Sequence, residues 1–235
     1  MRELLDAFFD PQKFRLAMPD VWDGFQVNIE MMAIAEVVVL VLALIIAVIR
    51  GLPGRAAWPL RALAVGYTDA FRGTPLILVA FLIGFGLPSL NLSVISTQSI
   101  LAYGIMSLVL VYTAYVTEVY RAGIESVHPS QRAAARSLGL SYGQTMRYVI
   151  LPQAVRRVIP PLLNDFVGLQ KDTAIITVIG VVEALSQSQN FSANYFNFTG
   201  YTVAAVFFII LTIPFARFTD YIIAQRERRE RAQAA

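Results

Sequence analysis

No charged residue occurs between Gly73 and Thr117, and this run sets what the chain can fold into. An apolar helix of about 20 residues crosses the hydrocarbon core of a bilayer, so the run is too long for one crossing. A polar stretch with few helix-forming residues, 88–99, divides it into two predicted spans at about 62–87 and 100–120. We therefore expect at least two membrane-spanning helices in this part of the chain.

Other apolar stretches predict three more spans, at about 25–49, 160–185 and 199–223. Only 15% of the 235 residues are charged, whereas a soluble domain carries about 25%. The predicted fold class is therefore an all-α polytopic membrane protein with five transmembrane helices.

The arginines predict how these spans are oriented, because cytoplasmic loops are enriched in Arg and Lys. Arginines gather at 50–61, at 121–157 and at 217–231, whereas the loops 88–99 and 186–198 contain no basic residue. With five spans, this places the N-terminus outside and the C-terminus in the cytoplasm. The same distribution accounts for most of the net charge of +3, so we expect no nucleic-acid partner.

The composition argues against an enzyme. The chain has no cysteine, so disulfides, iron–sulfur clusters and thiol chemistry are excluded, and its single His128 argues against a metal site. Neither lysine, Lys13 or Lys171, follows the glycine pattern of a phosphate-binding loop. We expect no catalytic residue, no metal and no cofactor in this chain, so ATP would have to bind to another chain.

The two ends of the chain are expected to lie outside the membrane-spanning domain, residues 25–223. Residues 1–24 contain acidic residues within an apolar run and no clear cleavage site, so they are not a standard signal peptide. Their leucines and aromatic residues predict a short helix at the outer membrane interface, and a disordered tail is the alternative. Residues 224–235 form a charged cytoplasmic tail.

The segment 131–152 is short, polar and basic although apolar stretches flank it. Residues 130–138 are predicted to form a short helix that ends at Gly139, a residue that accepts left-handed dihedrals. Pro152 marks a second boundary, where the next helix starts or kinks. A polytopic protein with such a helix on its cytoplasmic side has a surface that a partner can bind.

This segment resembles the EAA loop of ABC importer permeases, E-A-A-x3-G-x9-I-x-L-P. Ala134, Ala135, Gly139, Leu151 and Pro152 match the pattern, and Ala133 stands where the loop carries its glutamate. The residues expected to couple to an ATPase in this loop, which spans about 121–158, are Gln131, Arg132, Ala133, Ala134, Ala135, Gly139, Leu151 and Pro152.

Three other segments resemble permeases for polar amino acids of the histidine, glutamine and glutamate type. They are the F-R-G-T-P element at 71–75, the T-A-Y…E-V-Y-R-A-G-I element at 113–124, and P-L-L-N-D-F with L-Q-K-D-T and V-I-G between 161 and 180. The elements occur in the family's order over nearly the whole chain.

The resemblance implies the type I fold of an ABC importer permease in a bacterial inner membrane. It implies two cytoplasmic ATPase subunits that bind ATP and Mg²⁺, an extracytoplasmic substrate-binding protein, and a second permease chain. Ala133 removes a charged contact with an ATPase, so we predict a heterodimer whose sister chain keeps the glutamate; a homodimer is the alternative.

The charged residues inside the predicted spans are the candidates for substrate binding, because burying a charge in a bilayer is costly. Lys171 and Asp172 lie about eleven residues into the fourth predicted span, or roughly 16 Å deep at 1.5 Å per residue. An amino-acid zwitterion needs contacts of both signs, which Arg72, Lys171, Asp172 and Glu36 can supply. The alternatives are an ion-pair lock between helices, for which Asp172 can pair with Arg72, and an Arg72 that reaches the cytoplasmic interface.

The predicted function is the permease subunit of an ATP-driven importer for a polar amino acid such as glutamate or glutamine. An ATP-independent secondary transporter or channel is the main alternative, and a scaffolding subunit or an exporter are further ones. The EAA-type loop favours the importer.

Overall fold

The chain is helical throughout the part that the computed structural model describes, residues 2–52, 54–91 and 99–234. Its elements in chain order are α1 (Arg2–Phe8), α2 (Pro11–Arg50), α3 (Trp58–Gly73), α4 (Leu76–Phe81), the π-helical turn η1 (Leu82–Gly86), α5 (Leu87–Ser89), α6 (Ile100–Glu125), α7 (Pro129–Ser137), α8 (Tyr142–Thr145), the π-helical turn η2 (Met146–Ile150), α9 (Leu151–Asp172), the 3-10 helix η3 (Thr173–Ile179), α10 (Ala184–Tyr195) and α11 (Thr199–Ala234).

Polar side chains fix where several helices start by binding backbone N–H groups that the first turn leaves free. Asp10 accepts from Gln12 N at 2.8 Å and so begins α2. Ser99 accepts from Ala102 N at 3.2 Å at the start of α6. Ser141 and Gln144 form a reciprocal capping box that starts α8.

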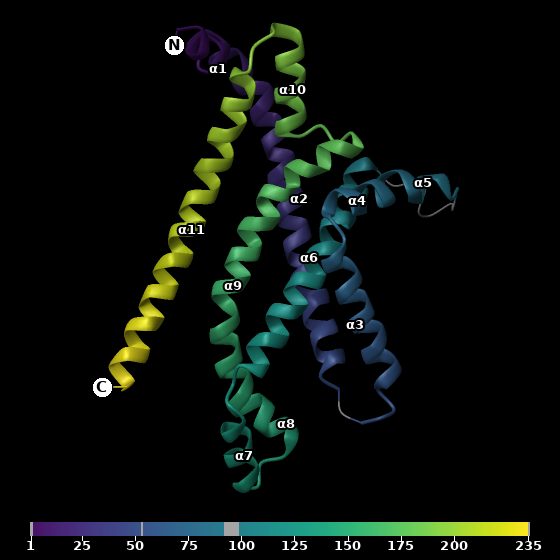
Figure 1. The fold of residues 1–235 in the computed structure, drawn as a ribbon, viewed down its shortest axis with the longest axis vertical. Helices are drawn as coiled ribbons and strands as arrows, with labels where there is room; N and C mark the ends of the chain where they lie inside the picture. The colour runs from purple at the N-terminus through teal and green to yellow at the C-terminus, as the bar shows by residue number, and fades with distance from the viewer. Residues whose placement is uncertain (1, 53, 92–98, 235) are drawn as a thin grey trace.

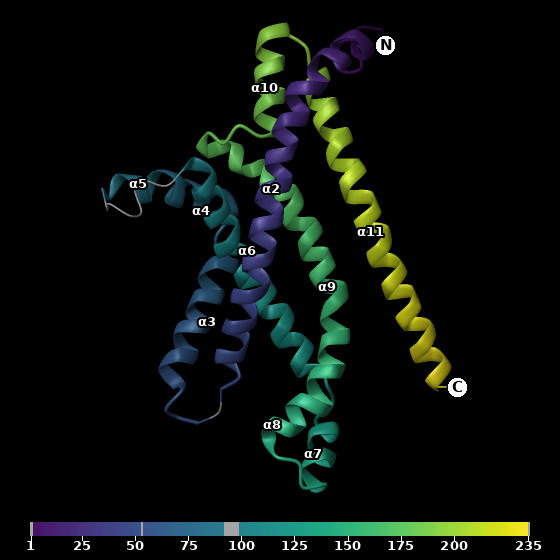
Figure 2. The same cartoon turned by 180° about the vertical axis from the view of Figure 1, so that it is seen from behind.

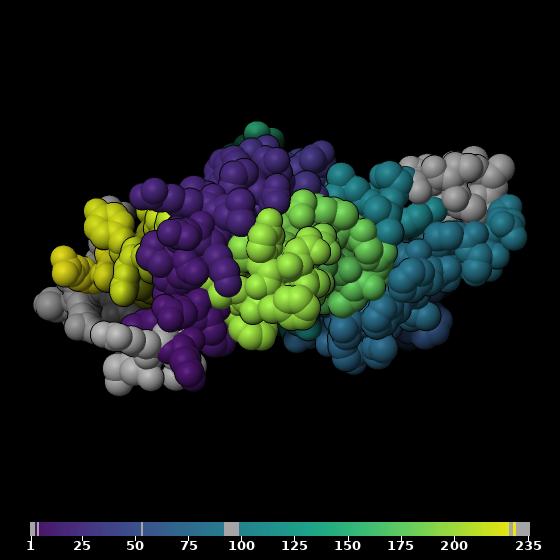
Figure 3. Space-filling view, turned by 90° about the horizontal axis from the view of Figure 1, so that it is seen from above, coloured from purple at the N-terminus to yellow at the C-terminus, as the bar shows by residue number. Residues whose placement is uncertain are grey.

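The long helices α2, α6, α9 and α11 run along the length of the molecule, with α10 at one end and the α7–α8 hairpin at the other (Figure 1). The view from behind shows the same order, with α11 on the outside of the bundle (Figure 2). Seen from above, the molecule is elongated, with α4 and α5 at one end and α11 at the other (Figure 3).

Small residues let the long helices approach one another closely, as they do in membrane bundles. Ala35, Val39 and Ala43 recur every four residues along α2 and are fully buried in the main core. Gly123 of α6 faces Val158 of α9, and a Cβ at this glycine would overlap the valine side chain. The glycine therefore sets the closeness of α6 and α9.

Three helical segments are long and apolar enough to cross a membrane: Leu5–Arg50, Ile100–Glu125 and Thr199–Gln225. The pair α3 and α4 makes a fourth if it counts as one span, and its two helices are bent by 106°. The predicted all-helical polytopic fold is confirmed, with three to four candidate spans in the described part of the chain.

Two predicted spans have different bounds in the structure. The span expected at 62–87 is broken after Gly73, because Pro75 has no N–H to continue the helix. The span expected at 160–185 starts earlier, at Leu151, and α9 ends at Asp172. The chain then turns through η3 and Gly180, whose φ is 96°, before α10 begins. Helix α9 contains five charged residues and is not one of the three helices that are apolar enough to cross a membrane.

No helix boundary lies at residue 24, where the N-terminal segment is predicted to end. Helix α2 begins at Pro11 and passes through residue 24 without a break. Only α1 precedes it, and its last carbonyls are bound by the start of α11: Phe198 N donates to Ala7 O at 2.9 Å, and Thr202 Oγ1 donates to Phe8 O at 2.7 Å. The interfacial position of α1 stays a prediction, and most of the outer loop expected at 88–99 lies outside the described residues.

Candidate functional site

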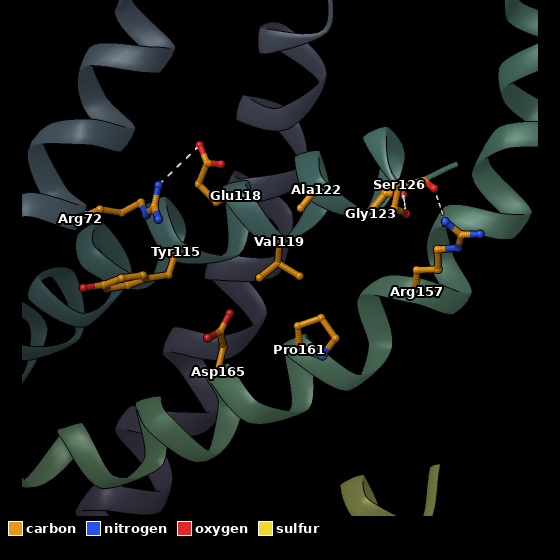
Figure 4. Close-up of a pocket in the computed structure, with 10 residues that line it drawn as sticks. All are labelled: Arg72, Tyr115, Glu118, Val119, Ala122, Gly123, Ser126, Arg157, Pro161 and Asp165. Carbon is orange, nitrogen blue, oxygen red and sulfur yellow. Dashed lines mark hydrogen bonds and ion pairs between the residues drawn. The ribbon is translucent and has the colours of Figure 1, made fainter. Parts of the chain in front are cut away.

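A cavity of about 500 Å³ lies between α3, α6 and α9 (Figure 4). Two stripes of residues with helical spacing line it, because positions three and four apart share one face of a helix. Helix α6 contributes the residues Tyr115, Glu118, Val119, Ala122, Gly123 and Ser126. Helix α9 contributes Arg157, Pro161 and Asp165, and α3 contributes Arg72.

Glu118 is the centre of a charged cluster at the edge of this cavity. Arg50 of α2 forms an ion pair with it, and Arg121 Nε donates to its Oε2 at 2.9 Å. The Arg72 Nη1 atom is 3.8 Å from Glu118 Oε1, a distance too long for a hydrogen bond (Figure 4). The carboxylate of Glu118 thus joins three helices.

Arg72 is the guanidinium of this cluster that is least committed to Glu118. Its side chain is 44% exposed, whereas that of Arg50 is 12% exposed and bound directly. A cation that lines a cavity and holds its counter-ion only loosely can turn to a ligand at little cost. Arg72 therefore suits a carboxylate that enters the cavity.

Asp165 lines the same cavity from α9, across from Arg72 (Figure 4). Its Oδ2 atom is buried, and no described residue donates a hydrogen bond to it. A buried acceptor without a donor costs free energy. The cavity thus has a cationic group and a carboxyl group on different walls, the arrangement that a zwitterion requires.

The four residues predicted to bind substrate do not meet in one place. Arg72 lines the cavity just described, whereas Glu36 lines a second cavity of about 300 Å³ with apolar residues such as Leu40 and Phe166. Lys171 and Asp172 line neither of these cavities. Asp172 accepts a hydrogen bond from the Tyr112 hydroxyl at 2.7 Å, and Lys171 is exposed.

The idea that Asp172 pairs with Arg72 is wrong, because the ion pair of Arg72 is with Glu118. The alternative in which Arg72 reaches the cytoplasmic interface stays a prediction. Arg72 lies in the last turn of α3, one residue before the helix ends at Gly73. Its side chain turns into the cavity all the same.

Sequence reasoning missed Asp165 and Tyr115 as site residues. A usable signal exists in the spacing. Arg157, Pro161 and Asp165 follow one another at intervals of four, so they share a face of α9. A carboxyl group on that face, within a predicted membrane span, is by itself a reason to suspect a functional site.

The predicted coupling loop forms the α7–α8 hairpin at one end of the molecule. The short helix expected before Gly139 is confirmed as α7, and Gly139 has the left-handed φ of 85°. Helix α9 begins at Leu151 with Pro152 in its first turn, as the proline predicted. Most of the predicted coupling residues are exposed: Gln131, Arg132, Ala133, Ala134, Gly139, Leu151 and Pro152.

One residue of the loop, Ala135, is buried instead. It faces inward from α7 and supports the hairpin, so it does not present its side chain to a partner. Leu138 is 83% exposed and adds an apolar contact point at the tip.

Residues 40–229 match the model of a family described as "Binding-protein-dependent transport system inner membrane component". A probable glutamine ABC transporter permease of Bacillus subtilis is 36% identical over 171 residues, which cover 72% of this chain and 77% of that protein. A glutamate transport system permease of Corynebacterium glutamicum is 35% identical over 206 residues, which cover 83% of this chain and 89% of that protein.

A solved structure has a similar fold. It is the crystal structure of an amino acid ABC transporter with histidines, which superposes with a TM-score of 0.80 at 30% identity. The superposition covers 88% of this chain and 94% of the other.

Proposed function

This chain belongs to the family of binding-protein-dependent transport system inner membrane components, and we propose that it lines the path of a polar amino acid. It is the permease subunit of an ATP-driven ABC importer and a multi-pass membrane protein. The ATP-independent secondary transporter or channel is not supported by these relatives.

The observation that carries the substrate proposal is the pair of opposite groups in the larger cavity. Arg72 binds the α-carboxylate of the amino acid, and Asp165 accepts a hydrogen bond from its ammonium group. Both groups are partly shielded from water, which strengthens their contacts with a ligand. Tyr115 lies between them on α6 and limits the size of the side chain that fits.

The other candidate residues take supporting places in this proposal. Lys171 is exposed, so it can face a pathway shared with a second permease. Asp172 is held by Tyr112 and is partly buried next to it. Glu36 stands in an apolar groove between α2, α9 and α11, where a passing cation can reach it.

We propose that the chain crosses the membrane five times, with the N-terminus outside and the C-terminus in the cytoplasm. The two termini lie at opposite ends of the molecule, which suits an odd number of crossings (Figure 1). The α7–α8 hairpin carries Arg132 and Arg136, Arg147 follows it in η2, and the hairpin lies toward the C-terminal end of the bundle (Figure 1). The positive-inside tendency places that end in the cytoplasm.

The exposed α7–α8 hairpin is the surface on which we base the proposed partners. Two ATPase subunits that hold ATP and Mg²⁺ contact α7 through Gln131, Arg132 and Ala134, and a substrate-binding protein delivers the amino acid at the α10 end. Ala133 is exposed where the loop of the family has its glutamate, so we propose a heterodimer with a sister permease that keeps it. The membrane is the bacterial inner membrane. The proposed domain bounds are those from the sequence: an N-terminal segment 1–24, a membrane-spanning domain 25–223 and a tail 224–235. A fully active complex with two copies of this chain as its permeases would refute the heterodimer.

The test is uptake by the complete importer reconstituted in liposomes, with radiolabelled glutamate, glutamine, histidine and arginine. Arg72→Gln and Asp165→Asn are compared with Asp69→Asn, which removes a charge from an exposed position of α3. Losing a charged contact worth about 1.4 kcal/mol raises the KM about tenfold. We expect such a rise for both site variants and no change for the control.

The result that overturns the site is a wild-type KM for every amino acid in both variants. Uptake that follows an ion gradient and needs no ATP would overturn the importer itself.

A further inference from the structure

A fully buried carboxyl group lies at the end of the molecule opposite α7, outside the substrate cavity. Glu183 is 0% exposed and begins α10 as its N-terminal cap. Its Oε2 accepts from Leu185 N at 2.9 Å, and its Oε1 accepts from Ser186 N at 2.8 Å. Burying a carboxyl group without partners is costly, and three donors bind this one: Leu185 N, Ser186 N and Asn28 Nδ2. The bonds therefore offset part of the cost of burying the group.

Asn28 of α2 connects this cap to two other elements. Its Nδ2 atom is 3.0 Å from Glu183 Oε2 and 3.0 Å from Thr173 Oγ1 of η3. Its Oδ1 accepts from Ala184 N at 3.1 Å. Asn28 is 2% exposed and Thr173 is 0% exposed, so water does not replace these bonds readily. Three side chains thus join α2, η3 and α10.

The helices around this network are packed too closely to slide past one another. A Cβ at Gly24 would lie 2.6 Å from the carbonyl carbon of Glu183 and 2.7 Å from Ala184 N. On its other side η3 presses Ile176 against Gly104 of α6 and Ile179 against Gly84 of η1. The η3 turn is therefore fixed between the α2–α10 pair and the α4–α6 side of the bundle.

We propose that Asn28, Thr173 and Glu183 are positioning residues that keep α2, η3 and α10 together as one rigid unit throughout the transport cycle. The inference rests on the proposed function, because the unit matters only if α7 receives a movement from an ATPase. Helix α9 runs from the hairpin end directly into η3. A displacement of α9 reaches the α10 end undiminished if η3 cannot move separately from α2 and α10.

The first test measures how many ATP molecules are hydrolysed for each amino acid taken up by the reconstituted importer. Glu183→Gln replaces one acceptor oxygen with an amide that faces N–H donors, and Asn28→Asp sets a second carboxyl oxygen against Glu183. The control is Asn190→Asp, the same chemical change at an exposed position of α10. We expect the ratio to rise between about twofold and thirtyfold in the two network variants and to stay unchanged in the control.

A conservative pair separates positioning from folding. Thr173→Val removes the hydroxyl that accepts from Asn28, and Thr173→Ser keeps it. The valine variant is expected to raise the ATP-to-substrate ratio and the serine variant to restore it, in complexes of equal size and yield. A wild-type ratio in Glu183→Gln, Asn28→Asp and Thr173→Val would overturn the proposal.

The second test does not depend on transport. Hydrogen exchange of the amides of residues 184–186 is measured in the wild-type complex with and without ATP. A rigid unit predicts the same protection in both states. Faster exchange when ATP binds would mean that the network opens during the cycle and would refute the proposal, even in a complex that carries no amino acid.

Discussion

The turn at Gly139 allows a prediction with a magnitude, because only one physical effect acts there. The residue has a φ of 85°, and a Cβ placed on it would meet no atom within 4 Å. Gly139→Ala therefore introduces no clash, and its cost is the intrinsic strain of an L-residue in the left-handed region, about 1–2 kcal/mol. This free energy acts against the turn that ends α7.

Three backbone hydrogen bonds report on that turn. Leu138 N donates to Ala134 O at 3.1 Å, Gly139 N to Arg136 O at 3.0 Å, and Leu140 N to Ala135 O at 3.2 Å. They open together when the left-handed residue leaves its conformation, as in the motif that commonly ends helices. A cost of about 1–2 kcal/mol lowers their protection from hydrogen exchange about 5- to 30-fold.

The assay is hydrogen exchange on the purified complex, resolved to residues 138–140. Gly143→Ala is the matched control, because Gly143 lies in α8 with nothing within 4 Å of its Cβ and no positive φ. We expect its exchange at 138–140 to match that of the unmodified chain. Unchanged protection in Gly139→Ala would show that the turn does not depend on the glycine. Gly139→Asp adds a charge at the same place and is expected to abolish uptake while leaving membrane insertion intact.

Two more predictions concern packing and charge. Gly24→Ala forces a methyl group against the backbone at the start of α10 and should destabilise the chain by about 1–3 kcal/mol, which lowers its thermal midpoint. In the control Gly66→Ala the added methyl group enters open space, so the thermal midpoint should not fall. Glu118→Ala leaves the partly buried Arg50 without its anion and should cost about 2 kcal/mol in denaturant unfolding. The comparison is Glu125→Ala, whose 63% exposed side chain should contribute less than about 1 kcal/mol. Equal midpoints within either pair would contradict the corresponding argument.

The parts of the fold that depend on local sequence could be predicted. The end of α7 at Gly139 and the start of α9 next to Pro152 follow from the backbone limits of single residues. The apolar runs likewise predict helices, because inside a membrane every backbone N–H and C=O group must be hydrogen-bonded within its own segment. The break after Gly73 was not predicted, although Pro75 accounts for it, and the 106° bend depends on how α4 packs against its neighbours.

The site depends on contacts between distant residues, and these were mostly missed. Asn28 binds Glu183, 155 residues away, and neither was a candidate. Lys171 and Asp172 were predicted to bind substrate because they are charged residues inside a predicted span. Neighbouring positions on a helix face different directions, and neither residue lines the cavity that Arg72 lines. Asp165 and Arg72 line one cavity because α3 and α9 both pack against α6, a fact of tertiary structure that spacing along the chain does not contain.

The unbroken length of α2 has a mechanical consequence. The helix has 40 residues and runs past Pro19 to Arg50 without interruption, so at 1.5 Å per residue it is about 60 Å long. A stiff rod of that length acts as a lever: a tilt of only 5° about one end displaces the other by about 5 Å, close to one turn of a helix. Arg50 attaches one end of this rod to Glu118, and its other end carries α1. Angular changes too small to disturb the packing of any single residue can therefore add up to movements large enough to open or close a passage for a small molecule.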